Sequence, residues 1–346
     1  MKKCFLILGI FFLFFFSGCE KNTGNTKNTF FLGNDYYTIA SPFKSSVGNN
    51  YILNNNVNAY DIKEVETSLM ELSTMYFKTD SSYYQDGQFL TVSDLKTLLS
   101  KEKLNNYPEI TIDNVLIDPY YVSGLYEQNY LDEKNNLKGI SIGIILNPYQ
   151  KYQNTYGTYL YKEIDEKTLL QIGEEVSQKL LEYLREKEEL KNCKILIGLY
   201  VQNSPTATMP GSYKKYGITV NKEITFKETS KNYYYLTSSH VLENNNEIYN
   251  AFQILQEEIK EILPKTYLIG TAKYQNGSIS DITIHITAPY FTKSEILMLC
   301  NLVEEGILTN YSNTIHINVY IKENDIIKAL LIKEKSEIKI HILEEK

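Results

Sequence analysis

Cys19 is the residue whose surroundings most clearly indicate a chemical reaction. The chain begins Met1-Lys2-Lys3, continues through an almost entirely apolar run at 4–16, and then reads Ser17-Gly18-Cys19. A positive start, a short apolar segment and small residues before a cleavage point are typical of an export signal. The run is too short for a bilayer-spanning helix, which needs roughly 20 apolar residues. A cysteine after two small residues resembles the lipobox, in which the thiol is acylated and the signal is cut between Gly18 and Cys19. The alternative is a plain secretory signal whose cysteine is incidental.

A lipid on Cys19 would attach the mature chain to the outer face of a membrane. A cysteine-linked diacylglyceryl carries two acyl chains, and two chains are what stable attachment requires. Residues 20–28 are rich in Asn, Thr and Lys and have no apolar face to bury, so we expect a flexible tether at 19–34. The expected location is therefore the cell membrane, lipid-anchored and facing the extracellular side. The expected partners are the membrane itself and the enzymes that process lipoprotein signals.

Other catalytic or metal-binding patterns are sparse. The sequence contains no His-Glu-x-x-His pair, no Gly-rich phosphate loop followed by Lys, and no Cys-x-x-Cys. We therefore expect no catalytic residues, no cofactor and no enzymatic activity. His285 and His316 fall on the polar sides of two alternating strands and would share a surface if those strands pair. They could then hold a metal together, but no third ligand is evident, so we expect two exposed histidines and no metal site.

The composition limits the classes of partner. Lys and Arg number 35 against 42 Asp and Glu, giving a net charge of −7. Arg185 is the sole arginine, so the bidentate arginine contacts typical of nucleic-acid recognition are nearly unavailable, and we expect no nucleic-acid binding. Abundant Lys, Asn, Ile and Tyr with no Trp resemble proteins of AT-rich Gram-positive genomes. Cys193 and Cys300 are predicted to be buried free thiols, with a disulfide as the alternative.

Two stretches of the sequence repeat the same order of elements. In the first, an alternating strand at 139–146 precedes a helix at 165–188 and a strand at 194–201. In the second, a strand at 281–287 precedes a helix at 292–308 and a strand at 314–321. The period-2 and period-3.6 patterns change at matching places in both stretches. We therefore predict two related modules, arranged as a tandem repeat.

The flanking residues extend the second module to the order α-β-β-α-β-β. A helix at 247–263 and a strand at 267–274 come before it, and Asn276-Gly277 predicts a hairpin turn between two strands. A last strand follows at 326–332. In the first module the opening helix is at 93–104, a weaker strand is at 110–117, and 118–138 reads as an insertion. The predicted fold class is α+β, with helices packed on one face of each mostly antiparallel sheet.

These patterns define the predicted domains. A signal at 1–18 and a tether at 19–34 precede an N-terminal module at 35–210, which includes a leading helix at 61–77, and a C-terminal module at 211–346. Two helix starts look capped, one at Asp61 with Glu64 and one at Thr292 with Glu295. Residues 204–217 contain two prolines and two glycines, so we expect them to join the modules, where an inter-domain cleft could lie.

With these features assembled, the chain resembles the CamS family of sex-pheromone-precursor lipoproteins of Gram-positive bacteria. The resemblance covers nearly the whole chain and rests on the segments at Cys19, 36–37, 42–44, 60–62, 66–70, 84–90, 139–146, 197–199 and 209–211. It implies that a short apolar peptide is trimmed from the signal and released as a mating pheromone for conjugative plasmids. The corresponding segment here comprises Phe12, Leu13, Phe14, Phe15, Phe16, Ser17 and Gly18.

Two other functions stay open. One is an extracytoplasmic binding protein that holds a peptide, a glycan or another small ligand in a cleft between the repeats. Tyrosine clusters at 36–37, 83–84, 120–121, 149–161 and 233–235 could line such a surface, although tyrosines also commonly cover sheet faces and helix ends. The other is a surface hydrolase, for which the sequence shows no clustered acid, base and nucleophile. The ligand of the ectodomain is unknown.

Overall fold

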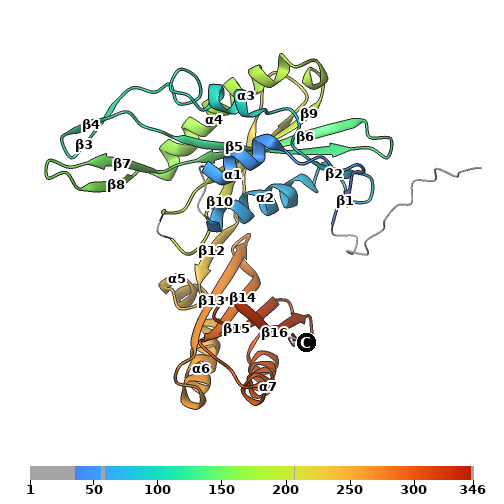
Figure 1. The fold of residues 1–346 in the computed structure, drawn as a ribbon, viewed down its shortest axis with the longest axis vertical. Coiled ribbons are helices and arrows are strands. Elements are labelled where there is room, and N and C mark those ends of the chain that lie inside the picture. The colour runs from blue at the N-terminus through green and yellow to red at the C-terminus, as the bar shows by residue number, and fades with distance from the viewer. Residues whose placement is uncertain (1–35, 56–58, 206, 344–346) are drawn as a thin grey trace, which may run out of the picture.

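The computed structural model describes residues 36–55, 59–205 and 207–343, which form two modules joined through β12 (Figure 1). The predicted signal and tether, with Cys19 and the candidate pheromone segment, lie outside the described residues. The elements in chain order are β1 (Thr38–Ile39), α1 (Val47–Asn55), α2 (Ala59–Ser73), β2 (Tyr83–Asp86), α3 (Val92–Leu98), β3 (Ile110–Ile112), β4 (Val115–Ile117), β5 (Val122–Leu131), β6 (Leu137–Leu146), β7 (Tyr149–Gln153), β8 (Tyr159–Glu163), α4 (Glu166–Arg185), a 3₁₀ turn (Glu188–Leu190), β9 (Lys194–Val201), β10 (Ser212–Thr219), β11 (Phe226–Glu228), β12 (Asn232–Tyr235), α5 (Ser239–Asn244), α6 (Asn246–Ile262), β13 (Tyr267–Gln275), β14 (Ser278–Ala288), α7 (Lys293–Asn310), β15 (His316–Glu323), β16 (Ile326–Glu334) and β17 (Glu337–Ile342).

The first module is built on a seven-stranded sheet in the order β1-β2-β5-β6-β9-β10-β11. At its centre β5 pairs antiparallel with β6, β6 pairs parallel with β9, and β9 pairs antiparallel with β10. Helix α4 lies on one face, where Ile142 sits opposite Ile197 in the hydrophobic core. The helix approaches closely, since a Cβ on Gly173 would lie 2.8 Å from the Leu146 side chain. The predicted strand–helix–strand unit is therefore present here.

Helices cover both faces of this sheet, whereas the sequence predicted one covered face. Helix α2 packs on the face opposite α4, where Gly143 lies beside Gly198. Tyr213 fills the space above these glycines, and its hydroxyl donates a 3.0 Å hydrogen bond to the Val65 carbonyl oxygen in α2. The prediction was wrong for a physical reason. Alternation locates the apolar face of a strand, but small residues on the other face can equally meet solvent or a closely packed element.

Strand β5 was missed, because it lies within the stretch read as an insertion at 118–138. It is a central strand, and nine of its ten residues are buried. Polar residues Glu127, Gln128 and Asn129 occupy its middle, all at 2% exposure or less. A strand covered on both faces loses the alternating pattern that marks a half-buried one. The predicted strand at 110–117 is instead the small β3–β4 hairpin outside the main sheet.

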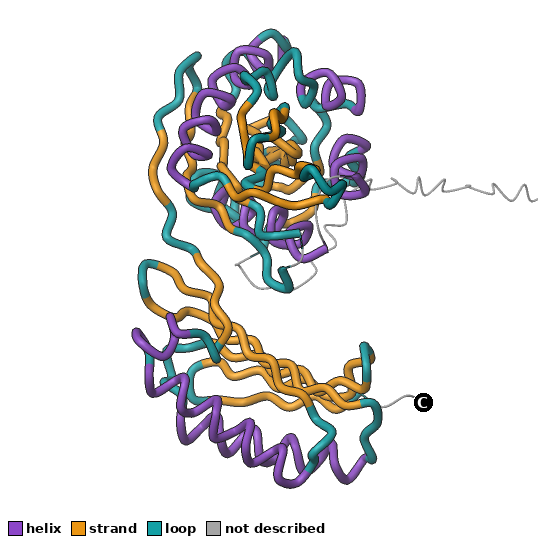
Figure 2. Tube along the Cα trace, turned by 90° about the vertical axis from the view of Figure 1, so that its left-hand side faces the viewer, coloured by secondary structure: helices purple, strands orange, loops and turns teal. Residues whose placement is uncertain are grey.

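The second module has a six-stranded sheet in the order β12-β13-β14-β15-β16-β17. Figure 2 shows its helices gathered along one face, and there α6 and α7 contribute Phe252 and Leu299 to a core shared with Ile284 and Val319. For this module the prediction of helices on one face is confirmed. The Asn276-Gly277 turn is confirmed as well, with φ of 54° and 79° at the two residues, as a tight hairpin of this kind requires. The capping box of Thr292 and Glu295 is also present.

The change from one sheet to the other falls between Glu228 and Asn232, and not at the predicted boundary of 210 and 211. Strands β10 and β11 pair within the first sheet, so the segment at 204–217 comprises the loop that leads from β9 to β10 and most of β10, and it does not join the modules. The loop is instead fixed to α2 through Asp61, which is fully buried. Its Oδ1 accepts 2.6 Å hydrogen bonds from the Tyr200 hydroxyl and from the Gly211 backbone N–H. Asp61 therefore joins α2 to the end of β9 and to the loop before β10 by hydrogen bonds. The predicted helix cap at Asp61 was wrong, since α2 begins at Ala59 and ends at Ser73.

Arg185 ends α4 and is buried, with 8% of its surface exposed. Its guanidinium donates to four carbonyl oxygens in two stretches of the chain: to Leu190 and, at 2.7 Å, to Cys193 in one, and to Asn221 at 3.1 Å and Thr219 at 3.3 Å in the other. Burial lowers the pKa of this group from its ordinary value. The sole arginine of the chain thus holds the end of α4 against the backbone at 190–193 and 219–221.

Candidate ligand-binding pocket

The two histidines considered for a shared metal lie on the same face of the second sheet but do not meet. In the parallel pairing of β14 with β15, His316 sits opposite Asp281 and His285 opposite Tyr320. Four residues of strand therefore separate them, roughly 13 Å at the usual rise per residue. His285 stacks on the Tyr320 ring at 5.1 Å, and His316 Nδ1 lies 3.6 Å from Asp281 Oδ1. Within the described residues, no group of three or more His, Cys, Asp or Glu side chains is placed to hold a metal ion.

We expected no Gly-x-Ser-x-Gly elbow in this chain, but the segment Gly139-Ile-Ser-Ile-Gly143 has the spacing of this hydrolase motif. Such a serine needs a sharp strand-to-helix turn that exposes its hydroxyl. Ser141 instead lies in the middle of β6, is fully buried, and shares a 2.7 Å hydrogen bond with the Ser73 hydroxyl. This serine packs α2 on the sheet and cannot reach a substrate.

The remaining candidates have structural roles. Cys193 and Cys300 are free thiols, as predicted, but only Cys300 is buried, whereas Cys193 is half-buried. Its partial burial raises the pKa of Cys193 to about 11. Tyr37 and Tyr84 are buried with Phe77 and Tyr130 in an aromatic cluster. Exposed tyrosines gather on the β7–β8 hairpin, where Tyr156 is 91% exposed. The predicted tyrosine clusters are therefore buried in the core in some places and exposed to solvent in others.

The junction between the modules, where the sequence placed a cleft, contains ion pairs. Lys231 lies in the segment between β11 and β12 and is 8% exposed. Its Nζ is 2.8 Å from Glu64 and 2.9 Å from Glu71, both on α2. Lys273 of the second sheet reaches Glu71 at 3.2 Å. Burial lowers the pKa of Lys273, but Glu71 and Asp281 outweigh it, and the pKa lies above its ordinary value. These contacts join the modules directly.

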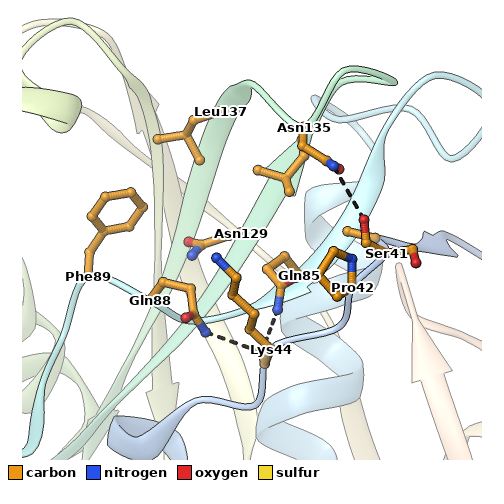
Figure 3. A pocket seen from close by; sticks show the side chains of 11 residues that line it. Ser41, Pro42, Lys44, Gln85, Gln88, Phe89, Asn129, Asn135 and Leu137 are labelled. Atoms are coloured by element: carbon orange, nitrogen blue, oxygen red, sulfur yellow. Dashed lines mark hydrogen bonds between the residues drawn. The ribbon is translucent and has the colours of Figure 1, made fainter.

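A pocket of about 300 Å³ lies within the first module, at the outer end of β2, β5 and β6 (Figure 3). This size is at the lower limit for ligand pockets, roughly 300–1,000 Å³, and suits one end group. Its lining combines apolar walls with amide, hydroxyl and ammonium groups from Ala40, Ser41, Pro42, Lys44, Gln85, Gln88, Phe89, Asn129, Leu131, Asn135 and Leu137.

Strand pairing and one buried carboxylate position this lining. Gln85 in β2 lies opposite Asn129 in β5, which places their side chains next to each other. Glu127, two residues before Asn129, is fully buried and accepts the backbone N–H of Gln88 at 2.9 Å and of Leu90 at 2.7 Å. Phe89 N–H also donates to it at 3.0 Å. Burial raises the pKa of Glu127, against the lowering effect of these donors. The carboxyl group therefore fixes the loop that carries Gln88 and Phe89.

The segment at 40–44 forms the opposite side of the pocket. The side-chain amides of Gln85 and Gln88 both donate to the Lys44 carbonyl oxygen, the second at 3.2 Å. Asn135 Nδ2 donates to Ser41 O at 3.3 Å, which connects the β5–β6 turn to the same segment. In Figure 3 the Lys44 side chain extends from this backbone toward Asn129. Two sequence segments far apart are thus held together around one cavity.

The polar groups left for a ligand are few. Lys44 supplies the one cation of the lining, which contains no carboxylate. Asn129 is 2% exposed, and within the described part of the chain its Oδ1 accepts no hydrogen bond. A buried acceptor without a donor costs about 1–3 kcal/mol, so such a group commonly serves a bound molecule or water. Asn129 was not among the residues predicted to form a site. The run of polar residues inside 122–131 is the signal that could have found it.

In the residues that the structure describes, no helix combines the length and apolarity needed to cross a membrane.

Comparisons with known proteins agree on one family. A family model described as CamS, the sex pheromone cAM373 precursor, matches residues 43–339. The crystal structure of a sex pheromone precursor from Lactobacillus salivarius subsp. salivarius UCC118 is 22% identical, with a TM-score of 0.81 over 91% of this chain and 98% of that chain. The C-terminal domain of the sex pheromone staph-cAM373 precursor from Staphylococcus aureus is also 22% identical, with a TM-score of 0.70 over 83% and 98% of the two chains. At these identities the solved structures show the shared fold alone. No curated protein sequence matches the chain significantly.

The family model covers most of the chain, from the pocket segment at Phe43 to Lys339 in β17, and the chain belongs to the CamS family of sex pheromone precursors.

Proposed function

We propose that this protein is a membrane-anchored extracytoplasmic lipoprotein that acts without catalysis and whose signal segment yields a short apolar signalling peptide. Cys19 carries this proposal, since it follows Ser17-Gly18 directly after an apolar run that two lysines precede. Family membership supports the second part, because the matching model is that of a pheromone precursor. The peptide would come from Phe12–Gly18, upstream of the lipidated cysteine.

Replacing the anchored cysteine tests the attachment. We expect Cys19→Ala to move the protein from the membrane fraction into the medium, because the acyl chains would have no attachment point. Cys193→Ala is the matched control and should stay at the membrane. Retention of Cys19→Ala at the membrane would contradict the lipid anchor. Mass spectrometry of spent medium tests the peptide: a fragment from 11–18 supports release, and its absence beside mature protein contradicts it.

We also propose that the two modules are related by repetition. The strand pairs β5–β6, β6–β9 and β9–β10 are antiparallel, parallel and antiparallel, with α4 between the parallel strands. The pairs β13–β14, β14–β15 and β15–β16 follow the same order, with α7 between the parallel strands. Equal order in both sheets supports a duplicated unit to which the first module has added further strands and helices.

A second function, ligand binding by the ectodomain, is favoured by one observation. The pocket of the first module contains the Lys44 cation and the buried, unpartnered Oδ1 of Asn129. The site differs from the inter-repeat cleft that the sequence suggested, and it is compatible with an anchored lipoprotein. Binding and anchoring can be tested separately.

A further inference from the structure

We infer that the pocket of the first module binds the C-terminal end of a peptide, through its free carboxylate, its last N–H and an apolar last side chain. This inference rests on the second of the two proposed functions, and it is independent of the lipid anchor. Three properties of the lining carry it, and each corresponds to one part of such a ligand.

The charge of the pocket favours an anion. Lys44 is exposed, and its ammonium extends into a lining that holds no Asp or Glu. Two carboxyl groups lie next to lining residues in the strands, and both are engaged elsewhere. Asp86, which follows Gln85, accepts from Ser46 N at 2.7 Å and from the Asn49 side chain. Glu127 accepts from the backbone N–H groups of the loop at 88–90. A lysine ammonium offers three donors and no acceptor. A carboxylate is therefore the group that matches it.

The buried side-chain oxygen of Asn129 can accept a hydrogen bond from a ligand. Oδ1 of Asn129 is without a hydrogen-bond partner among the described residues, while the amide N–H side of the group is engaged: Nδ2 donates to the Asp86 carbonyl oxygen at 3.5 Å, and the side chain also hydrogen-bonds the Glu127 carboxyl group. The amides of Gln85 and Gln88 are already engaged with Lys44 O. Asn129 thus remains as the acceptor for an incoming N–H. In a peptide end, an N–H lies one residue's backbone away from the carboxylate, so Lys44 and Asn129 can engage both groups together.

The walls favour an apolar side chain. Phe89, Leu131 and Leu137 are half-buried around the cavity, with Ala40 and Pro42 on the opposite side. A cavity of about 300 Å³ accommodates one large residue and not a long segment. The preceding residues of the peptide would therefore leave the pocket toward solvent. Capture of a C-terminal carboxylate by a small polar site is a recurrent mode of peptide recognition.

The test is a calorimetric titration of the full chain, purified in detergent micelles. The probe is acetyl-Ala-Ala-Leu with a free C-terminus, compared with the same peptide as its C-terminal amide and with acetyl-Ala-Ala-Glu. We expect the free acid to bind at least about tenfold more tightly than the amide, since one charge-assisted contact is lost, and Leu to be preferred over Glu.

Lys44→Met keeps the alkyl stem but removes the cation, and it should abolish the preference for the free acid. Lys134→Met removes an exposed lysine from the neighbouring β5–β6 turn, outside the lining, and should bind as the wild type does. Equal binding of acid and amide would overturn carboxylate recognition while leaving a peptide pocket. Absence of binding by every peptide would overturn both the inference and ligand binding at this pocket. Neither result would affect the fractionation of Cys19→Ala.

Discussion

His285 shows how a single half-buried group can make stability depend on pH. Its ring stacks on Tyr320 in the neighbouring strand. Burial lowers its pKa to about 4, and the charge of Lys322 acts in the same direction. In the unfolded chain the pKa of histidine is about 6.5, so between these values the unfolded state binds more protons. Stability contributed by neutral His285 is therefore complete above about pH 6.5 and is lost as the pH falls toward 4.

We expect His285→Gln to reduce this acid sensitivity. The free energy of unfolding should fall between pH 7 and pH 4.5 by about 1–2 kcal/mol less in the variant than in the wild type, because the group is only partly shielded from solvent. Urea denaturation at a series of pH values measures the difference, and shared carboxylate titrations cancel. His341→Gln removes an exposed histidine and is the control. Parallel pH curves for wild type and His285→Gln would show that the ring does not act this way.

Glu127 stabilises the fold through its hydrogen bonds to the surrounding backbone. Its carboxyl group holds three consecutive backbone N–H groups of the loop that forms one pocket wall. Asn49, from α1, donates to the Glu127 carbonyl oxygen at 2.7 Å and accepts from its N–H at 2.9 Å. One polar residue in a buried strand thus orders a loop and a helix. This is a reason for polar residues to persist inside β5.

At the scale of elements, glycine positions determine how closely α2 and α4 approach the first sheet. We expect Gly143→Ala to destabilise the protein by about 1–3 kcal/mol, because its Cβ would come within 2.2 Å of the buried Tyr213 hydroxyl. Gly306→Ala is the matched control in α7, where the nearest atom, of Leu255, would lie 3.4 Å away. There the change should stabilise by up to about 1 kcal/mol through helix propensity. Thermal unfolding compares the two, and equal effects would contradict this account of the sheet packing.

The elements that the sequence predicted well are those with one apolar face. Helix α7 and strands β14 and β15 were found because each alternates or repeats against a single core. Strand β5 was missed because it is buried on both faces, and polar Glu127 and Asn129 replace the expected apolar residues. The β7–β8 hairpin was interpreted only as a tyrosine cluster, since all five residues of β8 are exposed and no burial pattern marks the strand.

The pocket was beyond sequence reasoning for a related reason. Lys44 and the segment 84–90 supported the family resemblance, but their proximity depends on the pairing of β2 with β5, which the sequence did not predict. Cys19 shows the contrasting case. The residues that identify it as a lipidation site are consecutive in the sequence, so they can be recognised without knowledge of the fold.

At the scale of the whole molecule, the relative placement of the modules depends on charge. Lys231 is nearly buried between Glu64 and Glu71, and the hydroxyl of Ser68 accepts a further hydrogen bond from it. Removing one partner of such a group leaves the other charges poorly solvated. The junction should therefore be sensitive to single substitutions, although few residues form it.

We expect Lys231→Met to lower the free energy of unfolding by about 3 kcal/mol, the lower end of the range for broken buried pairs, because Glu71 is half exposed. Lys191→Met breaks the exposed pair with Glu188 and should cost less than about 1 kcal/mol. Urea denaturation measures both changes. If the two variants lose the same stability, the ion pairs at the junction do not hold the modules together.

Arg185 has one more consequence. A protease that cuts only after arginine has a single cleavage point in this sequence, and the folded chain encloses it among four carbonyl oxygens. In the mature chain that the proposed anchor implies, cleavage would produce two fragments of similar length, 19–185 and 186–346, once the end of α4 has detached from the backbone at 190–193 and 219–221. The rate of this single cleavage therefore reports how often the first module opens locally at the end of α4, with no label or added probe.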